Sequence, residues 1–125
     1  MSRECVFCSI EEDRILLEND HAVAFWDEFP VTKFHLLVVP KRHTENYFSI
    51  NSTELEACDD LLRAGADMVR NNDSSVEGFN IGSNAGEEAG QTIFHCHFHL
   101  IPRRKGDVSD SRGGIRNVIP GKGAY

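Results

Sequence analysis

The chain of 125 residues lacks three features that would direct it to a membrane, to secretion or to a nucleic acid. Its longest apolar run near the middle, residues 36–39, has the length of a strand and cannot span a bilayer. Residues 1–5 are polar and lack the apolar core of a secretory signal. The net charge is −7, whereas proteins that neutralise many phosphates carry basic patches. We therefore expect a cytoplasmic protein with no membrane or nucleic-acid partner.

Cysteine is too sparse for a disulfide scaffold, and its spacing is more informative than its number. Four cysteines in a chain of this kind do not indicate a disulfide framework. Cys5 and Cys8 form a C-x-x-C pair. Such a pair, considered alone, is compatible with metal binding, with redox chemistry or with no role.

Length and periodicity indicate one α+β domain without internal repeats or linkers. Thr53 and Glu56 form a capping-box pattern, and apolar residues follow at helical spacing, which predicts a long helix over 53–69. A short helical turn is expected within 5–12, and strands are expected at 14–18, 21–26, 33–39, 79–83 and 93–101. Short turns between most strands indicate a largely antiparallel sheet. Residues 106–125, rich in Gly, Arg and Ser, indicate an extended tail.

The chemistry of the chain is concentrated in residues 94–101, FHCHFHLI. Successive side chains of a strand point to opposite faces, so His95, His97 and His99 are expected on one face. Imidazoles are costly to bury without hydrogen-bond partners. Three in a row therefore indicate a bound ligand or a mutual relay, and the alternative is a polar strand face that meets solvent.

Glycine recurs every four residues before these histidines, at Gly78, Gly82, Gly86 and Gly90. The first two are interpreted as glycines required by turns. The last two lie among polar residues that can donate hydrogen bonds: Asn84, Gln91 and Thr92. Backbone N–H groups beside glycine can approach a phosphate closely. The spacing matches neither the Rossmann fingerprint nor the P-loop, so both are rejected.

These motifs together resemble the histidine triad family of nucleotidyl hydrolases and transferases. The resemblance rests on the alternating histidines, on Asn84 with residues 89–92, on residues 25–27 (FWD) and on residues 35–43 (HLLVVPKRH). Residues 88–92 and 101–103 are most similar to the branch that hydrolyses dinucleoside polyphosphates. The resemblance implies a five-stranded, mostly antiparallel sheet with one long and one short helix over residues 1–105, before the tail 106–125. It also implies a homodimer whose two sheets join.

The resemblance further implies roles for individual residues. His97 would attack the α-phosphorus of a nucleotide, His99 would assist the leaving group, and His35 would orient the triad, which includes His95. The phosphate would be held by Gly90, Gln91 and Thr92, with Asn84 beside them. Asp27 would accept hydrogen bonds from the ribose. The base would lie against Phe7, Ile10 and Phe25, for which simple core packing is the alternative.

A second set of residues has the chemistry of a zinc site. In bacterial relatives of this kind the C-x-x-C pair and two histidines bind zinc, which here implies Cys5, Cys8, His43 and His95. Two thiolates and two imidazoles complete a closed, structural tetrahedron. A zinc-bound His95 could not also act as a free acid or base. Two free thiols and a surface histidine are the alternative, and no organic cofactor is expected.

The predicted function is cleavage at the α-phosphate of a purine nucleoside polyphosphate, dinucleoside polyphosphate or phosphoramidate, through a nucleotidyl-histidine intermediate. Transfer to phosphate or another acceptor in place of water is an alternative within enzymes. A nucleotide-binding regulatory protein and a zinc-binding structural protein are alternatives from other classes. The sequence leaves open the leaving group, the base preference and any contribution of the tail to the site.

Overall fold

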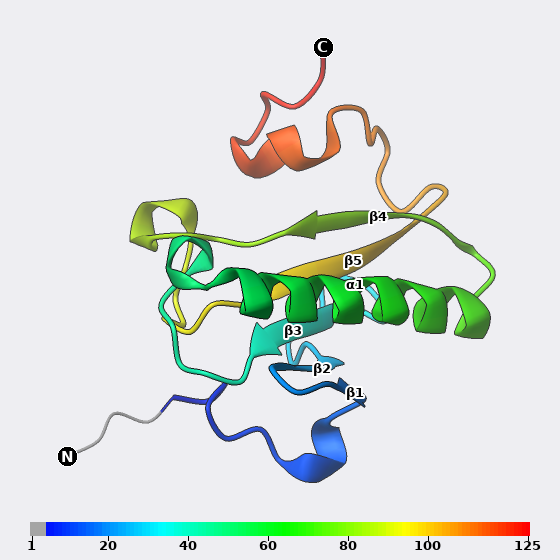
Figure 1. The fold of residues 1–125 in the computed structure, drawn as a ribbon. Helices are drawn as coiled ribbons and strands as arrows, with labels where there is room; N and C mark the ends of the chain where they lie inside the picture. Colours follow the sequence, from blue (N-terminus) through cyan, green and yellow to red (C-terminus); the bar gives the residue numbers. More distant parts are fainter. Residues whose placement is uncertain (1–4) are drawn as a thin grey trace.

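A five-stranded sheet organises the computed structural model, which describes residues 5–125 (Figure 1). Its strands lie in the order β1-β2-β3-β5-β4, and every neighbouring pair is antiparallel. The strands are β1 (Leu17–Glu18), β2 (Ala22–Trp26), β3 (Leu36–Pro40), β4 (Val76–Gly82) and β5 (Phe98–Arg104). This arrangement confirms the predicted α+β class and the antiparallel sheet.

The long helix α1 (Ser52–Asn72) connects β3 to β4. Its capping box is formed by Asn51 and Glu54, so the predicted box of Thr53 and Glu56 is wrong. The Asn51 side chain accepts a hydrogen bond from the Glu54 amide at 2.8 Å, and the Glu54 carboxylate accepts one from the Asn51 amide at 3.0 Å. Arg42 also donates to both carboxylate oxygens of Glu54. The ion pair between Arg42 and Glu54 thus favours the capping box at Asn51 over the similar pattern at Thr53.

Short 3-10 turns replace the predicted short helix. A turn closes from the Cys5 carbonyl to the Cys8 amide at 3.0 Å, and η1 (Glu12–Arg14) follows. The other short turns are η2 (Tyr47–Ser49), η3 (Glu87–Ala89) and η4 (Gly114–Val118). No helix within residues 5–125 has the length and apolar character required to cross a membrane.

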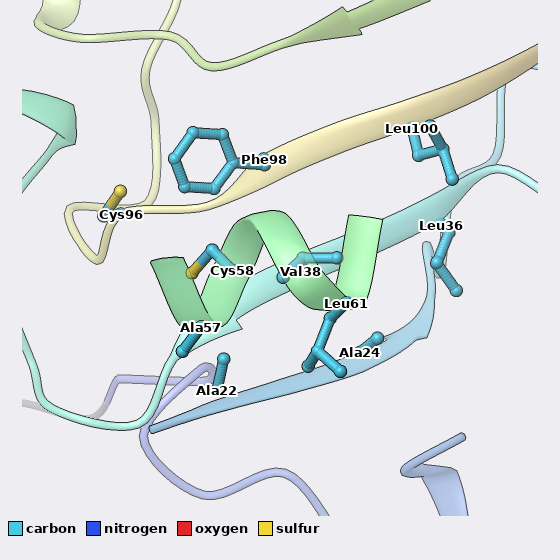
Figure 2. Close-up of a cluster of buried hydrophobic side chains, with 10 residues drawn as sticks. All are labelled: Ala22, Ala24, Leu36, Val38, Ala57, Cys58, Leu61, Cys96, Phe98 and Leu100. Atoms are coloured by element: carbon cyan, nitrogen blue, oxygen red, sulfur yellow. The ribbon is translucent and has the colours of Figure 1, made fainter. Parts of the chain in front are cut away.

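The two faces of the sheet pack against different parts of the chain. Figure 2 shows the face beneath α1, where Ala57, Cys58 and Leu61 of the helix meet Leu36, Val38 and other buried side chains of the sheet. The opposite face carries a second buried cluster, made of Val23, Phe25, Leu37 and Val39. Phe7, Ile10 and Ile15 pack against that cluster. The alternation of the strands therefore reserves one face for the helix and leaves the other for the N-terminal segment and the histidines.

The strand of the histidines is shorter than predicted. β5 begins at Phe98, and β4 pairs with it only from the Gly82–His99 pair onward. Earlier in the chain the Cys96 amide bonds to the Thr44 carbonyl at 2.7 Å, and His95 lies at a bend. The predicted strand 93–101 therefore starts too early: His95 and His97 precede β5, and only His99 lies within it.

Residues 106–125 differ from the extended tail expected from composition. They contain η4, and Arg116 donates a hydrogen bond from Nε to the Gly123 carbonyl at 3.0 Å. The segment thereby folds back on itself and lies beside β4 (Figure 1).

Candidate active site and metal centre

His97 is held in one tautomer by the backbone. The imidazole is buried, and its Nδ1 lies 2.8 Å from the carbonyl oxygen of His95. A carbonyl oxygen only accepts hydrogen bonds, so Nδ1 carries the proton. Nε2 is then unprotonated and presents a lone pair. This is the form of histidine that acts as a nucleophile.

A chain of hydrogen bonds fixes His35 and His99 in the same way. The Val31 amide donates to Nδ1 of His35 at 3.1 Å, so His35 carries its proton on Nε2. This Nε2 lies 2.9 Å from Nδ1 of His99 and donates to it. His99 must therefore carry its own proton on Nε2. The result is a hydrogen-bond donor beside His97, whose ring centroid lies 5.3 Å from that of His99.

Burial keeps these two histidines neutral. It lowers the pKa of His99 to about 4, and the neighbouring His97 and His35 act in the same direction. Burial also lowers the pKa of His35, although the carboxylate of Asp27 opposes the shift. His99 is thus a neutral donor at pH 7. It can stabilise negative charge on a phosphate without giving up its proton.

Asp27 lies where β2 ends, beside the histidine chain. One carboxylate oxygen is 3.4 Å from Nε2 of His35, and the other accepts a hydrogen bond from the Phe29 amide at 2.8 Å. Oxygen and nitrogen atoms of Asp27, His35 and His99 all lie within 4.8 Å of one another. The structure therefore places Asp27 at the site, and its contact with a ribose stays a prediction.

The glycine loop is shaped by Gln91 from inside. Gly86 and Gly90 have φ values of 101° and 96°, which side chains on an L-residue disfavour. The buried Gln91 accepts from the Gly86 amide at 2.8 Å and donates to the Glu45 carbonyl at 2.7 Å and to the Ile93 carbonyl at 3.1 Å. Its amide group thus ties the loop to Glu45 and Ile93. Gln91 positions the loop, and its contact with a phosphate stays a prediction.

The remaining predicted phosphate residues stay close to solvent. Gly90 and Thr92 are exposed on the loop, and Asn84 is half-buried. Sequence reasoning missed Ser83, whose hydroxyl donates to the His97 carbonyl at 2.7 Å. Its position directly after β4 and next to Asn84 was the available signal.

An apolar wall reaches His97 from the N-terminal segment. The ring centroid of Phe7 lies 5.0 Å from that of His97 and 5.6 Å from that of Phe25. Phe25 is buried within the sheet, whereas Phe7 and Ile10 are partly exposed and pack over it. Phe25 therefore belongs to the core, whereas Phe7 and Ile10 form an apolar surface beside His97, and contact of this surface with a base stays a prediction.

Cys5, Cys8, His43 and His95 meet in a cluster whose ligating atoms lie within 4.8 Å of one another. The sulfur of Cys5 is 3.4 Å from Nδ1 of His95, and the sulfur of Cys8 is 3.2 Å from Nδ1 of His43. Sulfur and nitrogen ligands of a tetrahedral zinc ion are separated by roughly 3.5 Å, as bond lengths near 2.3 and 2.0 Å require. The four side chains therefore fit zinc both in ligand type and in spacing.

The backbone also prepares His95 for this cluster. Its Nε2 donates to the Pro40 carbonyl at 2.8 Å, which leaves the lone pair of Nδ1 directed at the thiols. Desolvation and the adjacent Cys5 raise the pKa of Cys8 to about 11, so a cation is needed to stabilise its thiolate. Both ring nitrogens of His95 have partners. This favours the metal role over the catalytic role that the sequence also suggested.

Comparison with known proteins agrees with these features. The profile of the HIT domain matches residues 10–106, which leaves Cys5 and Cys8 just outside the match. The chain is 39% identical over 102 residues to the uncharacterized HIT-like protein SSO2163 of Saccharolobus solfataricus. The match covers 78% of this chain and 73% of that protein.

Two solved structures share the fold at 33% sequence identity and a TM-score of 0.75. One is a hypothetical histidine triad nucleotide-binding protein, ST2152 from Sulfolobus tokodaii strain 7, with 82% of this chain and 71% of that chain covered. The other is a zinc-bound histidine triad family protein from Mycobacterium smegmatis, with 82% of this chain and 77% of that chain covered. On these matches and on its motifs, the chain belongs to the histidine triad (HIT) family.

Proposed function

We propose that this protein is a nucleotidyl hydrolase or transferase that cleaves the α-phosphate linkage of a purine nucleoside polyphosphate, dinucleoside polyphosphate or phosphoramidate. The observation that carries the proposal is the tautomer of His97, whose Nδ1–H is bound by the His95 carbonyl. A lone pair on Nε2 next to a neutral donor on His99 is the arrangement needed for attack on a phosphorus atom.

The first step forms a bond between Nε2 of His97 and the α-phosphorus. In a phosphoanhydride the bond from phosphorus to the bridging oxygen breaks, and its electron pair leaves with the phosphate. His99 stabilises the charge on the phosphate oxygens by donating from Nε2. The His95 carbonyl stabilises the positive charge of the substituted imidazole, because it accepts the hydrogen bond from Nδ1.

The second step releases the nucleotide. Water attacks the phosphorus, the phosphorus–nitrogen bond breaks, and its electron pair returns to Nε2 of His97 while the water proton passes to solvent. Another acceptor in place of water would make the reaction a transfer. Asp27 binds the ribose, and Phe7 and Ile10, which pack over the buried Phe25, hold the base, in agreement with the partly exposed wall beside His97. Asn84, Gly90, Gln91 and Thr92 surround the phosphate.

Zinc is the proposed metal of the protein, held by Cys5, Cys8, His43 and His95. All four positions of a tetrahedron are then filled by side chains, so the ion is structural and pins the N-terminal segment beside the triad. A location in the cytoplasm agrees with this assignment, because metal-binding thiols must stay reduced.

A homodimer is proposed from the edge of the sheet. Within residues 5–125, β4 pairs with β5 on one side only, and Ile81 on it is 53% exposed. Phe79 and Ile81 line a groove of about 450 Å³ against α1. A second copy pairing along β4 would cover both features and would also contact residues 113–125, which lie beside that strand. Light scattering on the purified protein tests the oligomeric state.

The decisive experiment replaces His97 with Ala and follows turnover of adenine nucleotides and phosphoramidates. Loss of a covalent nucleophile should lower kcat by about a thousandfold or more while the fold survives. His21→Ala is the matched control, because His21 is exposed and lies outside the site. Mass spectrometry of quenched wild-type protein should detect adenylyl-His97. Near-normal turnover by His97→Ala would reject the assignment.

A further inference from the structure

The turn between β2 and β3 determines where His35 lies and which of its nitrogens is protonated. The Asp27 amide donates to the His35 carbonyl at 2.9 Å, and the His35 amide donates to the Thr32 carbonyl at 3.2 Å. Inside the turn the Val31 amide lies 3.1 Å from Nδ1 of His35. The turn therefore starts the relay that runs from the Val31 amide through His35 to His99.

This turn contains a strained residue. Within residues 5–125, Phe34 is the one non-glycine residue with a positive φ, of 72°. A bulky side chain disfavours that conformation, which persists only where the surroundings hold it. The ring centroid of Phe34 lies 5.2 Å from that of Trp26, and Nζ of Lys33 lies 5.0 Å from it. These contacts hold the Phe34 side chain, and the backbone before it needs a partner of its own.

Arg104, the last residue of β5, is that partner. β5 is the antiparallel neighbour of β3, so its end lies beside the residues that precede β3. Nη1 of Arg104 donates to Oγ1 of Thr32 at 2.9 Å, and Nη2 donates to the Lys33 carbonyl at 3.0 Å. Both bonds reach the turn directly before Phe34, where the strain is located.

Asp73 anchors the guanidinium from the other side. Nε and Nη2 of Arg104 donate to one carboxylate oxygen of Asp73 at 3.3 and 3.0 Å, and the other oxygen accepts from the Ser75 amide and hydroxyl. The bonds with Ser75 and Arg104 lower the pKa of Asp73 to about 2, so it is charged at neutral pH. The two side chains are only 18% and 20% exposed, and such a pair is screened less than a surface pair.

We propose that Arg104, anchored by Asp73, is a positioning residue that holds residues 31–35 in the conformation in which His35 donates to His99. The inference rests on the proposed function and extends its hydrogen-bond relay beyond the site. All three guanidinium nitrogens are bonded to Thr32, Lys33 or Asp73, so Arg104 acts through the turn. A planar guanidinium suits this role because it can bond in several fixed directions at once, whereas a lysine has a single nitrogen.

The turn matters for the reaction because the relay has two possible directions. If His35 carried its proton on Nδ1, its Nε2 would accept from His99, and His99 would then present a lone pair beside His97. A lone pair repels the charge on a phosphate, whereas a proton stabilises it. The Val31 amide excludes this second arrangement, because an N–H donor facing Nδ1 requires a lone pair there. Loss of the turn geometry would therefore remove the donor from His99.

The test replaces Arg104 with Met, which retains an unbranched side chain and removes every donor. Arg103→Met is the matched control, because Arg103 is the neighbouring residue of β5 and its hydrogen bonds go to Asp107 and Asn80. NMR of ¹⁵N-labelled histidine in the nucleotide-free protein should show His35 and His99 protonated on Nε2 in the wild type and in Arg103→Met. Arg104→Met should show a mixture with the Nδ1–H form.

Kinetics with an adenine nucleotide substrate should separate positioning from binding. Arg104→Met should lower kcat about tenfold and change KM less than twofold, since the donor is misplaced while the surface for the nucleoside is intact. Arg103→Met should change kcat less than twofold. Arg104→Lys restores a charge beside Asp73 without the fork, so its kcat should stay at least threefold below that of the wild type. Full recovery in Arg104→Lys would reduce Arg104 to an ion-pair partner and overturn the inference.

Wild-type tautomers in folded Arg104→Met, or equal changes in Arg103→Met, would also overturn it. If Arg104→Met does not fold, Thr32→Val gives the decision, because it removes one acceptor of Arg104 and leaves the pair with Asp73 intact. It should shift the same tautomers and lower kcat about threefold, and unchanged tautomers would reject the role of Arg104. If the wild-type protein cleaves no nucleotide, the proposed function fails, and the NMR comparison still decides whether Arg104 sets the relay.

Discussion

Backbone atoms determine which nitrogen of each site histidine holds its proton. Carbonyls accept from His97 and His95, and an amide donates to His35, which then donates to His99. One ring nitrogen of each imidazole therefore has a defined hydrogen-bond partner, and this determines whether the other nitrogen donates or accepts. The proposed roles of nucleophile, metal ligand and donor follow from these hydrogen bonds more directly than from the order of the residues.

His99 should remain neutral well below pH 6. Its pKa in the folded protein is about 4 because of burial, against 6.5 in the unfolded chain. The unfolded chain then binds more protons between these values, so stability is highest above pH 6.5 and falls as pH decreases toward 4. Urea denaturation should show that His99→Asn loses about 1–2 kcal/mol less than the wild type between pH 7 and 5. NMR of ¹⁵N-labelled histidine should show the Nε2–H tautomer at His99; a proton on Nδ1 would contradict the relay.

Asp27 should discriminate ribose from its deoxy analogues. The carboxylate lies at the site but retains only a hydrogen bond from Phe29 and a 3.4 Å approach to His35. Asp27→Ala should weaken ribonucleotide binding by about 1–3 kcal/mol, because the ribose hydroxyls lose their acceptor. A 2′,3′-dideoxynucleotide should be affected much less when affinities are measured by calorimetry. Equal losses for both ligands would show that Asp27 acts only through His35.

At the scale of the elements, the start of α1 depends on Arg42, which lies 12 positions before Glu54 in the sequence. Glu54 is buried, accepts from the Asn51 amide, and pairs with Arg42 in the segment that carries His43. Hydrogen bonding to Arg42 lowers the pKa of Glu54. This contact links the helix to the segment that carries His43, a proposed metal ligand.

Replacing Glu54 with Ala should therefore destabilise the protein by about 1–2 kcal/mol in urea denaturation, since the capping box and the ion pair are lost together. Glu56→Ala is the matched control on the same helix, where the side chain is exposed. It should change stability by less than about 0.5 kcal/mol. A cost for Glu56→Ala as large as that for Glu54→Ala would favour the helix start predicted from sequence.

The sequence predicted elements well where a local period repeats and poorly where a distant partner decides. Periodicity located α1 and the sheet, but two overlapping capping patterns, at Asn51 and at Thr53, could be separated only by Arg42. Alternation extended the histidine strand back to residue 93, although β4 offers no partner before His99. The histidine and cysteine sets were visible as motifs. The cavity of about 500 Å³ between β4 and the C-terminal segment could not be predicted, because it depends on how residues 113–125 fold back on β4.

At the scale of the whole molecule, α1 and the candidate active site lie on opposite faces of the sheet. The helix buries one face, and the N-terminal segment covers the other at Phe25 and Leu37. Residues 5–16, which form this segment, have little secondary structure beyond the turn from Cys5 to Cys8 and η1. Its position next to His97 therefore depends on side-chain contacts from Phe7 and on the cysteine pair, so the proposed zinc site would link stability to the candidate active site.

Zinc should hold this segment in place. Protein purified without chelator should contain about one equivalent of zinc, and Cys5→Ser should reduce it below about a tenth while lowering Tm by roughly 5 °C or more, because structural zinc contributes folding energy. Cys58→Ala is the control, since Cys58 lies in the core beneath α1 and should leave the zinc content unchanged. KM for nucleotides should rise more than kcat falls, because Phe7 loses its position while His97 keeps its backbone hydrogen bond. Zinc below about a tenth of an equivalent in the wild type, together with unchanged stability of Cys5→Ser, would leave the four residues without a metal-binding role.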